Sequence, residues 1–260
     1  MSVQHYENFP VASIFCPKRL RPAVSSLYWF ARTADDLADE GEVNWEQRLL
    51  NLKAYRADLV CTLNGERVTG QWQALFDALS SVIEQCPPIH HSLPFPAQHL
   101  HELLDAFEKD IRDTAAGYRY TTRQQLLDYC KLSANPVGRL MLHLFGVDDG
   151  TSKAQSDAIC SSLQLINFWQ DVSIDRPRRR FYKIDEPMQE LVCWARELMT
   201  SGAPLATRLG GRFGFELRLV IQGGLRILDK IEAQGFDTSV QRPKLNKWDA
   251  PRVLYRALLM

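Results

Sequence analysis

Two segments of the chain place aspartates four residues apart within helical sequence patterns. Asp35 and Asp39 form the first pair, with Asp36 between them, and Asp171 and Asp175 form the second. A helix brings the members of each pair onto one face, one turn apart, where their like charges repel. Carboxylate oxygens are ligands that Mg2+ prefers, and bound Mg2+ commonly bridges one or two carboxylates to substrate phosphates. The spacing therefore predicts a Mg2+-dependent site that holds a diphosphate.

Other polar side chains share each predicted aspartate face. Arg32 lies one turn before Asp35, while Gln164 and Asn167 lie two turns and one turn before Asp171. The second stripe is embedded in apolar sequence, namely Leu163, Ile166, Phe168, Trp169, Val172 and Ile174. A polar stripe in apolar surroundings usually lines an enclosed space. One acidic pair alone would be typical of a solvated surface helix, but two such faces with accompanying polar groups favour a binding site.

A run of cations follows the second aspartate pair. Four arginines and Lys183 fall within residues 176–183. Guanidinium groups bind phosphate oxygens through paired hydrogen bonds, so this run next to the aspartates predicts contacts with a diphosphate. The run alone is equally typical of an exposed basic loop or of a small nucleic-acid patch. A second basic stretch, 17–22, is equally consistent with phosphate contacts and with a surface turn.

A third region interrupts a helical pattern with Pro136 and Gly138. Because proline lacks an amide donor, the pattern predicts a kink at which backbone carbonyls lose their partners and can face a cavity. Tyr129 precedes this kink by about two turns. Without further context, a core position on an amphipathic helix is the simpler interpretation of this tyrosine.

Helical periodicity extends over almost the whole chain, and no alternating strand pattern competes with it. Helix breakers divide the chain into predicted helices at 22–40, 45–62, 71–86, 97–115, 122–146, 152–175, 188–201, 212–234 and 248–258. The proline-rich stretch 86–96 cannot continue a helix and is predicted to be a loop inside one domain. We therefore expect an all-α protein with a single domain over residues 1–260.

The composition limits the function classes. Lys plus Arg number 31 and Asp plus Glu number 31 in 260 residues, so the net charge is zero and nothing recommends nucleic acid as a partner. The first residues lack the basic and then apolar layout of a secretory signal, which predicts a cytoplasmic protein. Six scattered cysteines without a CxxC pair are expected to be free thiols. The histidines lack the spacing of metal ligands.

Any membrane contact is predicted to be peripheral. No apolar stretch reaches the roughly 18 to 20 residues that a spanning helix needs. The C-terminal segment 248–260 is amphipathic and basic, which suits either contact with the inner membrane or packing against the body of the protein. Packing is the more common role of such a segment.

Together these residues resemble the motifs of the squalene/phytoene synthase family, the head-to-head isoprenoid synthases. The first family motif, an arginine followed by DDxxD, matches Arg32, Asp35, Asp36 and Asp39. The second, QxxNxxxDxxxD with a later basic residue and tyrosine, matches Gln164, Asn167, Asp171, Asp175, Arg180 and Tyr182. A Tyr-Cys segment before a small-residue kink matches Tyr129, Cys130, Ala134, Val137 and Gly138. The resemblance covers nearly the whole chain and implies an isoprenoid (terpenoid) synthase-type helical bundle around a central cavity.

Three stretches, 5–13, 133–138 and 242–248, are more narrowly similar to the hydroxysqualene synthases of bacterial hopanoid biosynthesis. This similarity implies a carbon–oxygen lyase of squalene and hopanoid biosynthesis. Such an enzyme ionises presqualene diphosphate with the help of Mg2+ and lets water capture the rearranged carbocation. The similarity is also compatible with contact between this protein and other enzymes of the same pathway.

The resemblance implies roles for individual residues. The Mg2+ ligands would be Asp35, Asp36, Asp39, Asp171 and Asp175, of which Asp35 and Asp171 count among the catalytic residues. The substrate-binding residues would be Arg32, Gln164, Asn167, Arg180 and Tyr182, with the two arginines on phosphate oxygens. Tyr129 would orient the diphosphate or mediate proton movement, and Asn135 would hold the attacking water.

Two other functions stay open. The same aspartates would serve a presqualene diphosphate, squalene or phytoene synthase that uses prenyl diphosphates such as farnesyl diphosphate. No G-x-G-x-x-G motif follows a strand, which is weak evidence against hydride delivery from NADPH. The segment after Tyr182 is shorter than the usual continuation in the family. This shortening would suit a non-catalytic family member that works as a binding or assembly protein.

Overall fold

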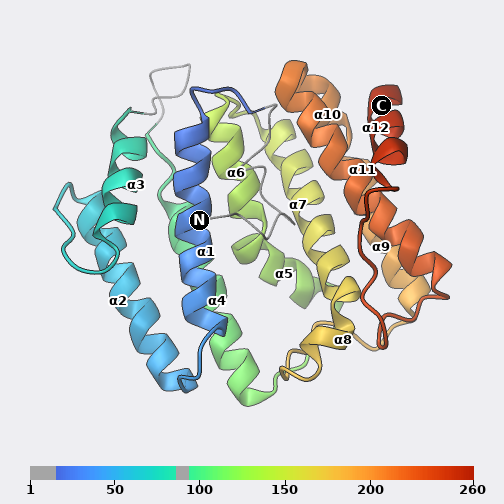
Figure 1. Cartoon of the computed structure of the whole chain (residues 1–260), viewed down its shortest axis with the longest axis horizontal. Helices are drawn as coiled ribbons and strands as arrows, with labels where there is room; N and C mark the ends of the chain where they lie inside the picture. Colours follow the sequence, from blue (N-terminus) through green and yellow to red (C-terminus); the bar gives the residue numbers. More distant parts are fainter. Residues whose placement is uncertain (1–15, 86–93) are drawn as a thin grey trace.

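The computed structural model describes residues 16–85 and 94–260, and most of the chain in these two stretches is helical (Figure 1). The helices are α1 (Arg21–Asp39), α2 (Trp45–Leu63), α3 (Gln73–Gln85), α4 (Gln98–Ala116), α5 (Arg123–Ser133), α6 (Asn135–Leu144), α7 (Gly150–Gln170), α8 (Val172–Asp175), α9 (Met188–Gly202), α10 (Pro204–Leu209), α11 (Gly211–Ala233) and α12 (Ala250–Leu259). The described residues contain one isolated β-bridge, between Arg119 and Phe181. The predicted all-α fold is confirmed.

Most helix boundaries follow from local sequence signals. Thr122 begins α5 with a capping box, in which its side chain accepts from the amide of Gln125 and the Gln125 side chain bonds back. Asp149 caps α7 by accepting from the amide of Ser152 at 2.9 Å. Gly117 ends α4 in the left-handed conformation, with φ of 64°. Local signals of this kind explain why the predicted boundaries are close to the observed ones.

The predicted helices 122–146 and 152–175 are each broken in two. The first divides at Ala134 into α5 and α6, because Pro136 cannot donate into the preceding turn. The second divides at Asp171, which ends α7 and leaves α8 as a separate turn. The prediction of a loop between 201 and 212 is wrong, because α10 occupies residues 204–209 with Pro204 in its first turn.

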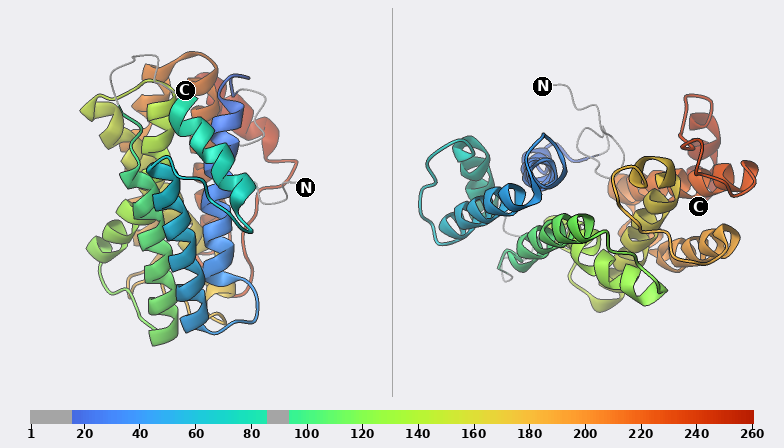
Figure 2. Two further views of the ribbon diagram at one scale, coloured as in Figure 1. Left: turned by 90° about the vertical axis from the view of Figure 1, so that its left-hand side faces the viewer. Right: turned by 90° about the horizontal axis from the view of Figure 1, so that it is seen from below.

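Two apolar clusters lie side by side in the molecule. The first is built mainly from α1 to α4 and includes Phe30 and Tyr55. The second is built mainly from α5, α7 and α9 to α11 and includes Trp169. Helix α6 contributes Leu140 to the first cluster and Leu142 to the second. Figures 1 and 2 show the same arrangement, with α1 to α4 on one side, α5 and α6 between, and α7 to α12 on the other.

Glycines let α7 approach its neighbours closely. A Cβ atom at Gly138 of α6 would lie 2.4 Å from the Ser156 hydroxyl oxygen, and one at Gly202 of α9 would lie 2.5 Å from the carbonyl oxygen of Gln155. Both distances are shorter than any ordinary contact, so a side chain there would push α7 away. Because α7 ends at the second aspartate pair, these contacts help to position the predicted site.

Several other predictions concern the termini, loops and thiols. Cys16, Cys61, Cys130, Cys160 and Cys193 are all free thiols, as expected. Cys86, most of the predicted 86–96 loop and the stretch 5–13 lie outside the described residues. In the parts of the chain that the structure describes, no helix is long and apolar enough to cross a membrane.

Candidate active site

The first aspartate motif lies at the C-terminal end of α1, on the flank beside the buried Ala34 and Ala38. Arg32 joins this motif, as its position one turn earlier predicts. Its guanidinium group contacts the Asp35 carboxylate at 3.2 Å, forms an ion pair with Asp36, and contacts Glu40 at 2.7 Å.

The second aspartate motif lies where α7 gives way to α8. Although α7 ends at Gln170, the amide of Asp175 still donates to the carbonyl of Asp171 at 2.8 Å, so the one-turn spacing survives the break. A turn then follows, in which Arg179 has φ of 61° and the amide of Arg180 donates to the carbonyl of Asp175 at 3.0 Å. This turn directs the chain back toward the aspartates.

Arg180 connects the two motifs directly. Its Nη2 atom donates to Oδ2 of Asp39 at 3.0 Å across 141 residues of sequence. Arg178 approaches the same carboxylate at 3.6 Å. The charge of Arg180 also acts on Asp35 and Asp175, one from each motif, and partly offsets the rise in pKa that burial causes in both. One guanidinium group therefore interacts with carboxylates of both aspartate motifs.

The carboxylates of Asp35 and Asp175 are difficult to ionise. Burial raises the pKa of each to about 7, and repulsion from Asp39 and Asp171, respectively, adds to the effect. The Asp35 side chain is nevertheless 42% exposed, so solvent screening reduces the energetic effect of the raised pKa at this carboxylate. A bound cation, in addition to the arginine side chains, would stabilise the ionised form of both carboxylates.

Asp110 of α4 is a site residue that the sequence reasoning missed. Its carboxylate accepts from the hydroxyl of Tyr129 at 2.5 Å and from that of Tyr182 at 2.9 Å. Burial raises its pKa to about 6, although both hydrogen bonds act in the opposite direction. A signal was present, because Asp110 continues an apolar stripe through Leu103 and Phe107 where a core residue is expected.

The two predicted tyrosines lie together around this carboxylate. Burial and the nearby Asp110 charge raise the pKa of Tyr129 and Tyr182 well above the ordinary range, so both hydroxyls remain protonated donors. Tyr182 stacks on Phe168 with ring centroids 3.9 Å apart, and Tyr129 lies 5.7 Å from the same ring. The aromatic cluster fixes the tyrosines from α5 and from the segment after α8 beside one another.

Arg242 is a second residue whose position the sequence did not reveal. It forms an ion pair with Asp171, and its Nη2 atom donates to Oδ2 of that carboxylate at 3.3 Å. The next residue, Pro243, accepts at its carbonyl from the Gln170 side chain at 2.7 Å. The stretch 242–248 was singled out only by its resemblance, since a partner 71 residues away leaves no local pattern.

A recess of about 60 Å3 adjoins the second motif, and its lining includes Asp175, Arg176, Arg180, Tyr182 and Lys183. Three of these side chains are cationic, so the recess suits an anion or ordered water. It is too small to enclose a long hydrocarbon chain.

The donor atoms suit Mg2+, but they are not gathered into one ready-made cluster. Among the described residues, no three acidic, histidine or cysteine side chains form a group that could hold a metal. Asp39 is engaged by Arg180, and Asp171 by Arg242. The oxygen donors and the raised pKa values of Asp35 and Asp175 fit a hard divalent cation, provided that some of these arginine contacts are exchanged on binding.

The model of one known protein family, described as squalene/phytoene synthase, matches residues 2–182. The chain belongs to the squalene/phytoene synthase family. It is 34% identical to a hydroxysqualene synthase of Zymomonas mobilis over 78% of this chain and 63% of that protein. It is also 34% identical to a hydroxysqualene synthase of Rhodopseudomonas palustris, over 68% of this chain and 54% of that protein. The chain thus spans only about half to three-fifths of the length of these curated family members.

Two solved structures share the fold of the chain. The fold superposes on the crystal structure of squalene synthase HpnC from Alicyclobacillus acidocaldarius with a TM-score of 0.76, at 32% identity, covering 90% of each chain. A dehydrosqualene synthase in complex with ligand shares the fold with a TM-score of 0.67 at 20% identity, covering 94% of this chain and 87% of that one.

The remaining predicted residues of this family site are placed on α6 and α7. Gln164 and Asn167 lie partly buried on α7, two turns and one turn before Asp171. Asn135, at the start of α6, is 7% exposed, and its side-chain oxygen accepts from the hydroxyl of Ser161 on α7 at 2.9 Å. One hydrogen-bonding atom of Asn135 is therefore already engaged across the α6–α7 contact.

The stretch 17–22 lies at the opposite end of α1 from the aspartates. It forms a turn, with the amide of Leu20 donating to the carbonyl of Pro17 at 2.9 Å. The rise of a helix places Arg21 about 27 Å from Asp39 along α1. The turn over residues 18–20 fits the surface-turn interpretation, and this separation argues against contact with a diphosphate held by the aspartates.

The shortened segment after Tyr182 is fixed in place. Lys183 donates to the carbonyls of Ile184 and Glu186 at 3.2 and 3.1 Å. Arg123 of α5 donates to the Glu186 carboxylate through two nitrogens, at 2.9 and 2.6 Å. These contacts tie the segment to the helix that carries Tyr129.

Proposed function

We propose that the protein is a hydroxysqualene synthase that converts presqualene diphosphate and water into hydroxysqualene and diphosphate. Three curated hydroxysqualene synthases are 33 to 34% identical to the chain, whereas presqualene diphosphate synthases and phytoene synthases are 26 to 27% identical. The gap in identity supports this branch of the family over the others.

The contact between Arg180 and Asp39 is the observation on which the proposal rests. It joins the basic run after the second aspartate motif to the first motif, as a site for one diphosphate requires. In the proposed complex Arg32 and Arg180 exchange carboxylate partners for phosphate oxygens, which guanidinium groups bind with paired hydrogen bonds. The carboxylates that they release become available to a cation.

Asp35, Asp39, Asp171 and Asp175, with Asp36 beside them, would hold the Mg2+ ions. Bound Mg2+ supplies neutralisation of the charge that develops on the leaving diphosphate. Gln164 and Asn167, on the α7 face that leads to Asp171, would bind the polar end of the substrate.

Tyr129, Tyr182 and Asp110 would handle the proton that water releases when it captures the carbocation. The tyrosine hydroxyls stay protonated and are directed at the Asp110 carboxylate. A carboxyl with a pKa of about 6 is suited to accept a proton near neutral pH. A hydroxyl of this kind can pass a proton to Asp110 while it receives one from the water. Asn135 would hold that water.

Separate incubations with farnesyl diphosphate and presqualene diphosphate test the proposal. With Mg2+ present, we expect hydroxysqualene from presqualene diphosphate and no condensation product from farnesyl diphosphate. Arg180→Gln should lower turnover by at least about a hundredfold, since it removes a charged contact to the leaving group. Formation of presqualene diphosphate or phytoene from prenyl diphosphates would instead favour a prenyltransferase.

A non-catalytic binding or assembly role is the second candidate. It is favoured by the shortened segment that follows Tyr182, where the match to the family model ends, whereas the aspartate pairs weigh against it. Millimolar Mg2+ with pyrophosphate should raise the melting temperature if the aspartates bind a diphosphate. No rise, together with no product from presqualene diphosphate, would favour the binding role.

A further inference from the structure

Helix α12 turns an apolar stripe toward solvent. Leu254, Tyr255, Leu258 and Leu259 are 46, 64, 63 and 70% exposed. Their spacing puts them on one side of the helix, whereas Ala257, the buried residue of α12, lies on the side that packs against α11. A stripe with this spacing normally faces a core, so its exposure indicates a binding surface.

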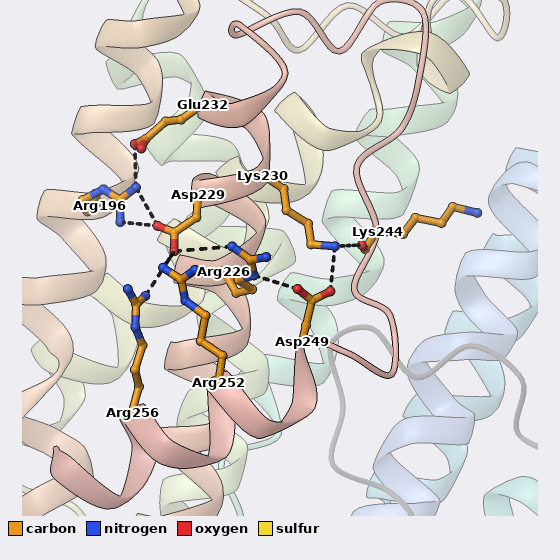
Figure 3. Close-up of polar contacts among 9 residues, drawn as sticks. All are labelled: Arg196, Arg226, Asp229, Lys230, Glu232, Lys244, Asp249, Arg252 and Arg256. Atoms are coloured by element: carbon orange, nitrogen blue, oxygen red, sulfur yellow. Dashed lines mark hydrogen bonds and ion pairs between the residues drawn. The ribbon is translucent and has the colours of Figure 1, made fainter.

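Ion pairs on α11 prevent α12 from rolling over to bury this stripe (Figure 3). Arg252 and Arg256 contact the Asp229 carboxylate at 3.3 and 3.1 Å. Asp249, at the start of α12, is held by Arg226 at 2.7 Å and by Lys230 at 2.6 Å. Rotation of the helix would break these contacts and leave the buried Asp249 charge unpaired.

The surroundings of the stripe carry excess positive charge. Residues 240–260 contain five cations and one aspartate, a net charge of +4 in a chain whose net charge is zero. Two of these cations, Arg252 and Arg256, join Arg196 and Arg226 around the Asp229 carboxylate, and the whole cluster sets five cations, with Lys230, against the three carboxylates of Asp229, Glu232 and Asp249. The excess of cations is complementary to an anionic surface.

An exposed tryptophan lies in the turn just before the start of α12. Trp248 is 79% exposed, lies seven residues before Tyr255, and has the ammonium group of Lys247 5.4 Å from its ring. Tryptophan and tyrosine are the side chains enriched at membrane–water interfaces. We define the α12 patch as Trp248, Leu254, Tyr255, Leu258 and Leu259.

We propose that the α12 patch docks the protein on an anionic lipid surface, with α12 lying in the plane of the headgroups. Apolar side chains on one face and basic residues beside them are the features of an interfacial helix. A second copy of the chain fits less well, because a twofold contact through this face would bring the basic residues of both copies together.

The patch is linked by a short stretch of chain to the candidate active site. The residues just before Trp248 reach the second aspartate motif, where Arg242 pairs with Asp171 and the Pro243 carbonyl accepts from Gln170. If the proposed function holds, the bilayer would supply and receive the long-chain isoprenoids close to their site. The docking itself does not depend on that function.

Flotation with lipid vesicles, in the absence of any substrate, tests the proposal. We expect the protein to bind vesicles of equal parts phosphatidylglycerol and phosphatidylcholine at least about tenfold more tightly than vesicles of phosphatidylcholine alone. The double variant Leu254→Gln/Leu258→Gln should lose about tenfold or more of this affinity. The matched control is Leu50→Gln/Val60→Gln on α2, where the native side chains are 59 and 43% exposed, and it should bind as the parent does.

Charge is tested in the same way. Lys244→Gln/Lys247→Gln should weaken binding to the anionic vesicles by about fivefold or more, whereas Lys53→Gln/Lys131→Gln, on α2 and α5, should not. Thermal melts establish that each variant is folded. Trp248→Ser, a change at a largely exposed position outside the helix, provides a further test if the α12 double variant does not fold.

Three outcomes would overturn the proposal: no binding by the parent protein, equal binding to neutral and anionic vesicles, or unchanged binding by both the α12 and the Trp248 variants. A dimer in solution that the α12 variant converts to a monomer would assign the patch to self-association instead. Activity on presqualene diphosphate, measured in detergent without vesicles, tests the proposed function separately.

Discussion

Asp35 and Asp175 are unfavourable to ionise in the folded protein. Both have a pKa raised by burial to about 7 from an ordinary value of 3.8. Between these values the folded state binds more protons than the unfolded chain, so the free energy of unfolding falls as the pH rises. In the presence of a chelator, we therefore expect the melting temperature to decrease from about pH 4 to about pH 7 as these two groups titrate.

Replacing one of these carboxylates should stabilise the folded protein when no metal ion is present. Asp35→Asn removes a charge that burial and the repulsion with Asp39 disfavour, so we expect it to raise the free energy of unfolding at pH 8 by about 1 kcal/mol in chelator, a value reduced for its partial exposure. The same variant should lose the stabilisation by Mg2+ and pyrophosphate. Calorimetry with Asp128→Asn, an exposed α5 carboxylate, as the control would measure both effects. A lower melting temperature for Asp35→Asn in chelator would contradict the prediction.

Asn135 has two roles that a paired substitution can separate. Its side chain accepts from Ser161 across the α6–α7 contact, and we propose that it also holds the attacking water. Asn135→Ala and Ser161→Ala each remove this hydrogen bond and should destabilise the protein by about 1 kcal/mol or more. Only Asn135→Ala should also change the ratio of hydroxysqualene to other products. Hydroxysqualene as the sole product at the parental rate would show that the water is held elsewhere.

Close helix contacts set the position of α7, and Gly202 permits one of them. A Cβ at Gly202 would lie 2.5 Å from the backbone oxygen of Gln155 and 2.6 Å from the Ile159 side chain. We expect Gly202→Ala to destabilise the protein by about 1 to 3 kcal/mol, because overpacking outweighs the gain in helix propensity of up to about 1 kcal/mol. Chemical denaturation provides the measurement.

Gly223 in α11 is the matched control for this prediction. Its added Cβ would meet only Leu245, at an ordinary 3.7 Å. Gly223→Ala should therefore raise the free energy of unfolding by about 0.5 to 1 kcal/mol, since only the helix propensity changes. Similar effects of the two substitutions would show that α7 can shift to accommodate a larger residue at Gly202.

The sequence predicted most elements because helical periodicity and capping signals are local. It failed where the information was not local. The six residues of α10 are too few to show a period, and nothing nearby indicates that α7 stops at Asp171. The sequence marks Asp110 only as a polar residue in an apolar stripe, and its partners Tyr129 and Tyr182 are known only from the tertiary structure. These parts of the site are created by tertiary contacts.

At the scale of the whole molecule, the candidate site lies where the two apolar clusters meet. The first aspartate motif is carried by α1, which packs in the first cluster, and the second by α7 and α8, which pack in the second. The Arg180–Asp39 ion pair crosses this boundary, and α6 contributes core residues to both sides. This shared packing is a physical reason to expect the described residues, 16–85 and 94–260, to unfold as one unit, and a single domain over 1–260 stays a prediction.

This arrangement predicts one unfolding transition that a diphosphate ligand shifts as a whole. The shared core of α6 should make the two clusters melt together, and a ligand held by carboxylates of both motifs stabilises both sides at once. A ligand at a hundred times its dissociation constant contributes about 2.7 kcal/mol, enough to raise the melting temperature of a chain of this size by several degrees. Calorimetry with and without Mg2+ and pyrophosphate would show this shift, and Arg180→Gln should reduce it. Two transitions, of which the ligand moves only one, would mean that a single cluster holds the diphosphate and that the two motifs do not form one site.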